Sequence, residues 1–193
     1  MDVVEWVMPP AAVALRAAVD GTLEARVDDR FGRPAMVVRS ISDRRAGALG
    51  SRDGDTIALA ARTARQAGMP IVLILASSGA DVHEGVEALV GWGRAAKELV
   101  AGSGIIPILA AVTGPAVSGP ALLLGLADLV VMTASSYTYV SGPRMVRQMT
   151  GAHVTSEALG GVAAQQRSTG VAARVVATDD DVEDALAELL AHL

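Results

Sequence analysis

Two short turns rich in glycine and serine contain the residues of this sequence that could do chemistry. They span 76–80 and 113–120, and each follows an apolar run and leads into a helical stretch. The first N–H groups of a helix have no intrahelical partner and lie at the positive end of the helix dipole. Two such turns side by side at the carboxyl ends of parallel strands would form an anion or oxyanion site. Turns of this composition are also ordinary connections, so spacing alone does not decide between the two.

Other side-chain chemistry is sparse. The three histidines, His83, His153 and His192, have no metal-ligand spacing, and the sequence contains neither cysteine nor a glycine-rich phosphate loop. The acids Asp179–Asp181 are better explained as the start of a helix than as a metal cluster. The sequence therefore predicts no metal site.

Ser118 offers a different chemistry. A serine at a strand-to-helix turn can be a nucleophile, as in the self-compartmentalising serine proteases. Those proteases share this architecture and have roughly this chain length. A catalytic triad would need a histidine nearby, and His153 is the downstream candidate before the terminal helix. No aspartate follows in a comparable turn, so a hydrolase is an alternative that the sequence leaves open.

The elements that must position these turns alternate between strand and helix. Short apolar runs predict strands, and longer periodic or alanine-rich runs predict helices. This alternation argues for an α/β domain with a parallel sheet. Strands are expected at 23–27, 34–39, 69–76, 105–112, 128–132 and 174–177, and helices at 9–19, 56–66, 84–100, 120–126 and 178–193.

Length and composition limit the class of protein. With 193 residues, the chain has room for one domain with a full core. The net charge of −5 and the scattered arginines, with Lys97 the only lysine, argue against nucleic-acid binding. No secretory signal is visible and no apolar run is long enough to span a membrane, so a soluble cytoplasmic protein is expected.

Several short motifs occur in a fixed order along the chain. They lie at 46–50, 77–85, 104–107, 114–119, 128–132, 141–143 and 150–161, the last reading Thr-Gly-Ala-His-Val-Thr-Ser-Glu-Ala-Leu-Gly-Gly. From about residue 32 to the C-terminus, this order resembles the N-terminal domain of the biotin-dependent acyl-CoA carboxyltransferases. Examples are the propionyl-CoA carboxylase β subunits and the related glutaconyl-CoA and malonate decarboxylase subunits. Each motif is weak by itself, whereas their shared order and spacing are specific.

The resemblance implies a crotonase (ClpP/crotonase-like) α/β fold of stacked ββα units with a mostly parallel sheet. It implies one domain over 1–193, with an N-terminal helix and extension at 1–31 and a core at 32–193. Enzymes of this family move a carboxyl group to or from the α-carbon of an acyl-CoA and stabilise the enolate with backbone amides. By position, the amides would come from Gly79, Ala80, Ser118 and Gly119. Substrate-binding positions would be Gly47, Ala48, Leu49, Ser78, Asp81, Gly142 and Pro143.

The resemblance also implies the substrates. They are a malonyl- or methylmalonyl-type thioester of CoA or of a carrier protein's phosphopantetheine, with no tightly bound cofactor. Asp81 stands where the family has arginine, and this reversed charge disfavours an anionic group there. Serines at 78 and 118 replace family glycines, and Pro120 lacks an N–H. These substitutions therefore disfavour carboxybiotin as the second substrate. They are compatible with a decarboxylase or with an enzyme that acts on carrier-protein thioesters.

A partner chain is expected as well. Single-chain members of the family carry a second, similar domain, and their active site lies between the two domains. We therefore expect a separate carboxyltransferase C-terminal-type subunit and a hetero-oligomer. A non-catalytic scaffold subunit that completes a partner's active site is the alternative.

Overall fold

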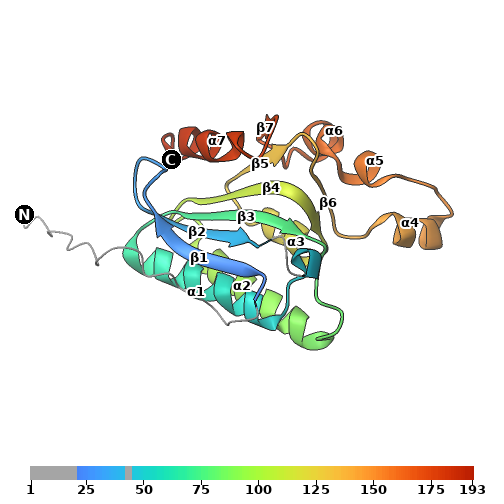
Figure 1. The fold of residues 1–193 in the computed structure, drawn as a ribbon, viewed down its shortest axis with the longest axis horizontal. Coiled ribbons are helices and arrows are strands. Elements are labelled where there is room, and N and C mark those ends of the chain that lie inside the picture. The colour runs from blue at the N-terminus through green and yellow to red at the C-terminus, as the bar shows by residue number, and fades with distance from the viewer. Residues whose placement is uncertain (1–20, 42–44) are drawn as a thin grey trace, which may run out of the picture.

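A computed structural model describes residues 21–41 and 45–193, and the helix expected at 9–19 lies outside these residues. The strands form one seven-stranded sheet in the order β1-β2-β3-β4-β5-β7, with β6 paired to β4 (Figure 1). β1 and β2 are antiparallel, and every other pairing is parallel. The strands are β1 (Leu23–Asp28), β2 (Ala35–Ser40), β3 (Ile71–Ser77), β4 (Ile108–Val117), β5 (Leu129–Thr133), β6 (Tyr137–Tyr139) and β7 (Arg174–Val176).

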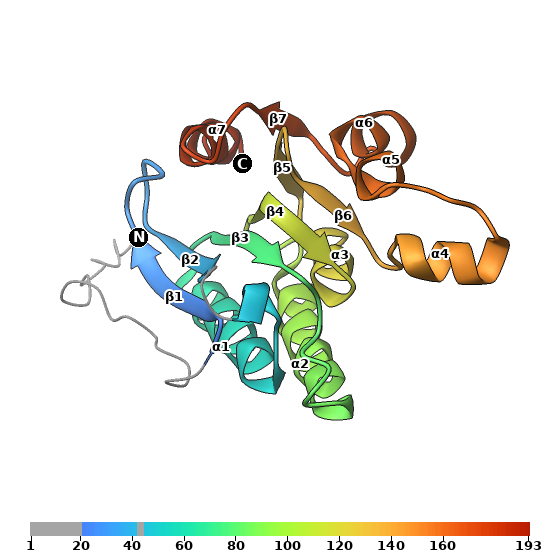
Figure 2. The same cartoon turned by 45° about the vertical axis from the view of Figure 1, so that its right-hand side comes forward.

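Helices cover both faces of the sheet. α1 (Ser51–Ala67), α2 (Val86–Gly102) and α3 (Gly119–Leu124) lie on one face, and α7 (Asp181–Leu190) lies on the other (Figure 2). Between β6 and β7 the chain forms the short helices α4 (Pro143–Thr150), α5 (Ser156–Gly160) and α6 (Val162–Ala164), followed by a π-helical turn at Gln165–Thr169. α5 packs beside β6, whereas α4 lies away from the sheet (Figure 2). No helix of the described part of the chain is long and apolar enough to cross a membrane.

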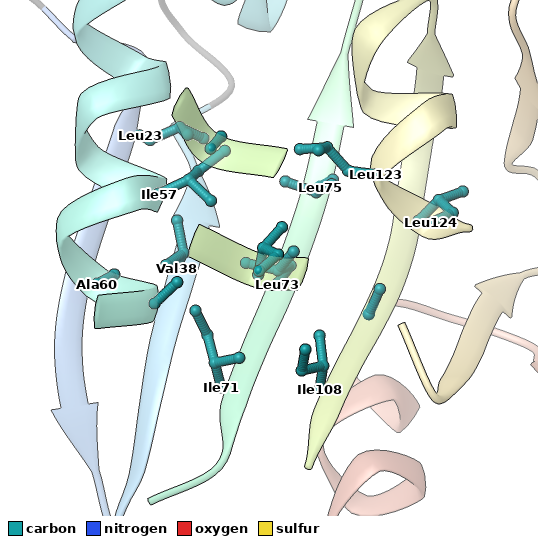
Figure 3. Close-up of a cluster of buried hydrophobic side chains, with 14 of the residues drawn as sticks. Leu23, Val38, Ile57, Ala60, Ile71, Leu73, Leu75, Ile108, Leu123 and Leu124 are labelled. Atoms are coloured by element: carbon teal, nitrogen blue, oxygen red, sulfur yellow. The ribbon is translucent and has the colours of Figure 1, made fainter. Parts of the chain in front are cut away.

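The alternation of side chains along the central strands separates two cores. Leu73 of β3 is fully buried against the α1–α3 layer, together with Ile57 and Leu123 (Figure 3). Its neighbours Val72 and Ile74 point the opposite way and pack with α7. Because both faces are covered, the strands are apolar on both faces, which explains the continuous apolar runs in the sequence.

Carboxylates at the start of α1 make this helix begin five residues before the predicted start. The Asp53 side chain accepts the N–H of Gly50 at 2.8 Å and that of Thr22 at 2.7 Å. Glu84 accepts the N–H of Ser51 at 2.6 Å. These acceptors satisfy donors that a helix leaves free at its N-terminus. Glu84 lies 33 residues away in sequence, so no local pattern indicates this contact.

The strands and helices predicted within the described residues are present, but the second turn is shorter than predicted. β4 continues to Val117 because its end pairs with β6, in the register Ala116 to Thr138. β6 and α4–α6 were not predicted from the sequence. β1 lies before residue 32, in the segment expected to be an extension, yet it contributes Leu23 and Ala25 to the core.

Candidate active site

The two glycine- and serine-rich turns touch one another. They lie at the ends of the adjacent parallel strands β3 and β4, in which Ser77 pairs with Ala116. Gly79 has a φ of +116°, a backbone conformation that favours glycine. A Cβ added there would lie 3.3 Å from the carbonyl oxygen of Val117 and 3.5 Å from Cβ of Ser118. The structure therefore brings the predicted pair of turns together at the carboxyl end of the sheet.

The segment 47–49 lies beside the first turn. The N–H of Leu49 donates to the carbonyl oxygen of Gly79 at 2.8 Å, and the N–H of Asp81 donates to that of Leu49 at 2.9 Å. Gly47 approaches so closely that a Cβ would overlap the carbonyl oxygen of Ala76. The predicted positions at 47–49 and 78–81 are thus neighbours, although about thirty residues separate them in sequence.

The charge of Asp81 is balanced by Arg45, which lies 36 residues earlier in the sequence. Asp81 is 3% exposed, and its Oδ2 lies 2.5 Å from a guanidinium nitrogen of Arg45. Its Oδ1 accepts the N–H of His83 at 3.0 Å. The His83 N–H and the Arg45 guanidinium hold the pKa of the Asp81 carboxyl below its usual range, against the opposing effect of burial. Arg45 therefore compensates the negative charge on which the prediction against an anionic group beside the first turn depends.

The second turn is strained and one of its amides is occupied. Ser118 has φ 63° and ψ −117°, outside the usual regions for a residue with a Cβ. Its N–H donates to the carbonyl oxygen of Tyr139 at 3.0 Å. Gly119 is the first residue of α3, so its N–H has no intrahelical acceptor, and Pro120 has no N–H.

The hydrogen bonds separate the four predicted amide donors into two groups. The N–H of Gly79 donates to Oγ of Ser77 at 3.2 Å, and that of Ser118 is bonded to Tyr139. The N–H groups of Ala80 and Gly119 have no acceptor within the described ranges. Ala80 and Gly119 therefore carry the two unoccupied amides, one on each turn.

The Trp92 ring of α2 packs against Gly119 in the second turn. A Cβ on Gly119 would lie 2.5 Å from Cε2 of the Trp92 ring, so only glycine fits there without a shift. The indole is 8% exposed, and its Nε1 is buried with no hydrogen-bond partner in the part of the chain that the structure describes. The ring fixes how far the first turn of α3 can sit from α2.

Tyr139 joins the predicted residues Gly142 and Pro143 to the second turn. Gly142 and Pro143 lie at the start of α4, outside the two glycine- and serine-rich turns. A Cβ on Gly142 would lie 3.3 Å from the Tyr139 ring, whose backbone carbonyl holds the N–H of Ser118. Tyr139 was not predicted as a site residue, and its only sequence signal is the alternation of Tyr137 and Tyr139, whose rings stack with centroids 5.5 Å apart.

The hydrolase alternative lacks its base in this structure. Oγ of Ser118 makes no hydrogen bond to a histidine or to any other residue of the ranges 21–41 and 45–193. A Ser–His pair within hydrogen-bonding reach is the usual feature of an activated serine. Among the described residues, the strained turn is the feature that favours this alternative.

Fold and site together define the class. A mostly parallel sheet with two touching strand-to-helix turns, each with a free amide, is a crotonase-type α/β domain. The model of the family described as "Carboxyl transferase domain" matches residues 13–193, so the chain belongs to that family.

Relatives and solved structures agree with this assignment. The chain is 32% identical over 174 residues to the methylmalonyl-CoA decarboxylase subunit alpha of Veillonella parvula, covering 90% of the chain and 33% of the relative. It is 32% identical to the propionyl-CoA carboxylase beta chain of Roseobacter denitrificans over 170 residues, or 88% of the chain and 31% of the relative. The chain thus spans about a third of the length of these curated relatives.

Solved structures show the same fold. The transcarboxylase 12S structure with hydrolysed methylmalonyl-coenzyme A bound superposes with a TM-score of 0.86 at 27% identity, covering 91% of this chain and 34% of that chain. A chain of the Pseudomonas malonate decarboxylase MdcD–MdcE hetero-dimer gives a TM-score of 0.79 at 22% identity, covering 93% and 81%. The fold predicted from the sequence is confirmed.

Proposed function

We propose that this chain is the N-terminal-type half of a carboxyltransferase or decarboxylase that acts on an acyl thioester through an enolate. The observation that carries the proposal is the pair of free amides, Ala80 and Gly119, on two turns in contact. Neutral N–H donors directed at one point stabilise negative charge that develops on an oxygen. No side-chain nucleophile is needed for this chemistry.

The proposed substrate is a malonyl- or methylmalonyl-type thioester of CoA or of a carrier protein. In decarboxylation, the bond between the α-carbon and the carboxylate breaks and CO2 leaves. The electron pair passes to the α-carbon and is delocalised onto the thioester oxygen, which Ala80 and Gly119 would hold. A proton then adds to the α-carbon. In carboxyl transfer, the α-carbon of an acyl thioester would instead lose a proton to give the enolate, whose carbon attacks the carboxyl carbon of a donor. The new C–C bond forms as the bond between that carboxyl carbon and the donor breaks, and the donor leaves with the electron pair and takes up the proton.

Carboxybiotin is the donor to be tested. One group of relatives is named biotin-dependent acetyl-/propionyl-coenzyme A carboxylase beta5 subunit, from Mycobacterium tuberculosis. The neutral pair of Arg45 and Asp81 removes the electrostatic objection to an anionic group beside the first turn. Donor-dependent and donor-independent reactions are therefore both compatible with the site.

A second carboxyltransferase domain on a partner chain would complete this site. Apolar side chains are exposed close to the first turn: Val82 is 83% exposed, Val86 68% and Leu89 60%. Exposed apolar surface of this kind is typical of an interface. We propose that these residues face the C-terminal-type partner.

The test is to co-express the chain with a C-terminal-type chain from the same genome and assay the purified complex. We expect CO2 release from malonyl and methylmalonyl thioesters, measured with and without a carboxybiotin donor by mass spectrometry. Gly119→Ala, which displaces the amide, should abolish turnover while size-exclusion chromatography still shows the complex. Turnover that survives in the assembled variant would show that the chain is a scaffold.

Ser118→Ala tests the hydrolase alternative, which the strained turn favours. The substitution removes the hydroxyl and keeps the backbone amides. Decarboxylation or carboxyl transfer should persist at close to the wild-type rate. Loss of thioester or ester hydrolysis in this variant, with the fold intact, would favour a serine hydrolase.

A further inference from the structure

Strand β1 forms one edge of the sheet. Within the described ranges it pairs with β2 alone, and Figure 2 shows it at the outer side of the sheet. β1 has six residues, whereas β7, the strand at the opposite edge, has three. A long edge strand presents a row of N–H and C=O groups that can pair with another strand, and a short one offers few. β1 is therefore the edge from which the sheet could continue.

The register of the hairpin shows which backbone groups of β1 face away from β2. The carbonyl oxygen of Thr22 accepts the N–H of Ile41 at 2.7 Å, so this group is directed toward the β2 side. The bonding direction alternates from residue to residue along an antiparallel strand. Counting from Thr22 through the regular register of β1, Ala25 and Val27 direct their N–H and C=O groups outward.

The charges of β1 are complementary to those of a second, antiparallel copy. Glu24 and Arg26 have opposite signs and lie on the same face of the strand, and both are partly exposed. Pairing about a two-fold axis at Ala25 would place Glu24 of each copy opposite Arg26 of the other, which stabilises a strand pair. A slide of two residues, the smallest that keeps both faces, would instead oppose Arg26 to Arg26 or Glu24 to Glu24. The charges therefore favour one register.

Both charged side chains keep capacity for a partner. Glu24 makes no hydrogen bond or ion pair with the described residues. Arg26 lies 3.3 Å from Asp28, and 42% of its side chain remains exposed. Charged side chains on an edge strand often prevent pairing between copies. In β1 the two signs alternate, so in this register they attract.

The same register satisfies the outward backbone groups. The Ala25 residues of the two copies would exchange N–H and C=O bonds, and Val27 would donate to the carbonyl oxygen of Leu23 in the other copy. The N–H of Leu23 needs no further acceptor, because it donates to Oδ1 of Asp53 at 3.1 Å. Leu23 and Val27 would face one another on the side where both already pack with the core.

We propose that β1 pairs with β1 of a second copy, so that two chains share one continuous sheet. The same strand is used on both sides of the two-fold axis, so the contact closes at a dimer. β2 lies between β1 and β3, whose carboxyl end carries the first turn. The contact is thus separate from the candidate active site, and it does not depend on the proposed function.

The test is sedimentation velocity of the 193-residue chain over a concentration series, in which we expect a reversible dimer. Glu24→Arg would oppose arginines and Arg26→Glu would oppose glutamates, so each should raise the dimer dissociation constant about tenfold or more. An equimolar mixture of the two variants should form a heterodimer, because each reversed charge then meets its opposite in the other chain. This recovery distinguishes strand pairing from damage to the fold.

Cross-linking tests the register directly, because the chain contains no cysteine. Oxidation of a mixture of Glu24→Cys and Arg26→Cys chains should link the two variants. The two positions would form a non-hydrogen-bonded pair, in which the Cα atoms of antiparallel strands are about 4.5 Å apart, within disulfide range. Glu24→Cys alone is the matched control, since the register sets its two copies apart, and it should stay uncross-linked.

Three outcomes would overturn the proposal. The first is a wild-type chain that remains monomeric at every concentration. The second is a dimer that both charge reversals leave unchanged, or one that the mixed variants fail to restore although circular dichroism shows both folded. The third is a control that cross-links as readily as the mixture, which would place the contact elsewhere on the chain.

Discussion

A Cβ on Gly119 would lie 2.5 Å from Cε2 of Trp92, so the second turn and helix α2 fit together with no room for a methyl group. The turn carries the free amide of the candidate site, and the indole sets its distance from α2. Packing and proposed chemistry therefore depend on the same contact.

Gly119→Ala should destabilise the chain as well as affect activity. Overpacking of this kind costs about 1–3 kcal/mol, because the ring or the turn must move. Thermal unfolding of the isolated chain measures the loss. Gly93→Ala is the control: Gly93 is exposed within α2 with open space around it, and removing a mid-helix glycine should raise stability by about 0.5–1 kcal/mol.

Ser118→Gly should stabilise the fold. A residue with a Cβ held at φ 63° and ψ −117° stores strain of about 1–3 kcal/mol, and glycine relieves this strain. Part of the gain is lost because glycine has a greater conformational entropy in the unfolded chain. Ser118→Ala keeps the Cβ and should show no such gain. Equal melting temperatures for the two variants would mean that the turn is not strained by its Cβ.

Trp92→Phe should be tolerated much better than Trp92→Ala. Phenylalanine keeps an aromatic ring beside Gly119 and removes a buried N–H without a partner, a group whose burial costs about 1–3 kcal/mol. This gain offsets the smaller ring volume. Alanine should cost about 3–5 kcal/mol through the cavity that it leaves. Chemical denaturation of the three proteins measures both differences, and a Phe variant as unstable as the Ala variant would contradict the argument.

Glu84→Ala should destabilise the N-terminus of α1. The Glu84 carboxylate accepts the Ser51 N–H at 2.6 Å, and loss of such a cap costs about 0.5–2 kcal/mol. Glu87, exposed in the first turn of α2, is the control, and Glu87→Ala should change stability by less than about 0.5 kcal/mol. Urea unfolding followed by circular dichroism compares the two.

Acid should weaken the hairpin of β1 and β2 through Asp28. Hydrogen bonds from Arg30 lower the pKa of Asp28 from 3.8 to about 2. Because the folded-state pKa is the lower one, this stabilisation is present above pH 4 and is lost as the pH falls from about 4 to about 2. Asp28→Asn should flatten the pH dependence of the melting temperature in that window. An unchanged slope in the variant would show that other carboxylates account for acid unfolding.

The local patterns of the sequence were enough to predict most of the sheet and its helices. Apolar runs such as 71–75 and 108–112 become fully covered central strands, and the alanine-rich stretch after residue 55 becomes most of α1. The short β6 and α4 were not predicted. Three strand residues give too little periodicity, and α4 has no buried face within the described part of the chain.

The candidate site was only partly predictable for a related reason. Glycine and serine between strand and helix indicate free backbone amides, and the family resemblance assigns them to Gly79, Ala80, Ser118 and Gly119. The amides of Gly79 and Ser118 are occupied by acceptors that neither the turn pattern nor the resemblance reveals. The acceptor for Ser118 lies on Tyr139, 21 residues further along the chain.

The sequence by itself determined most of the order of strands and helices, the position of the two turns and the family, because each depends on local composition, spacing and motif order. Only the tertiary structure decided which amides remain free and that Arg45 neutralises Asp81, 36 residues away. Hydrogen bonds and ion pairs need donor and acceptor within about 3 Å, and between distant segments this proximity is set by how the sheet and helices pack.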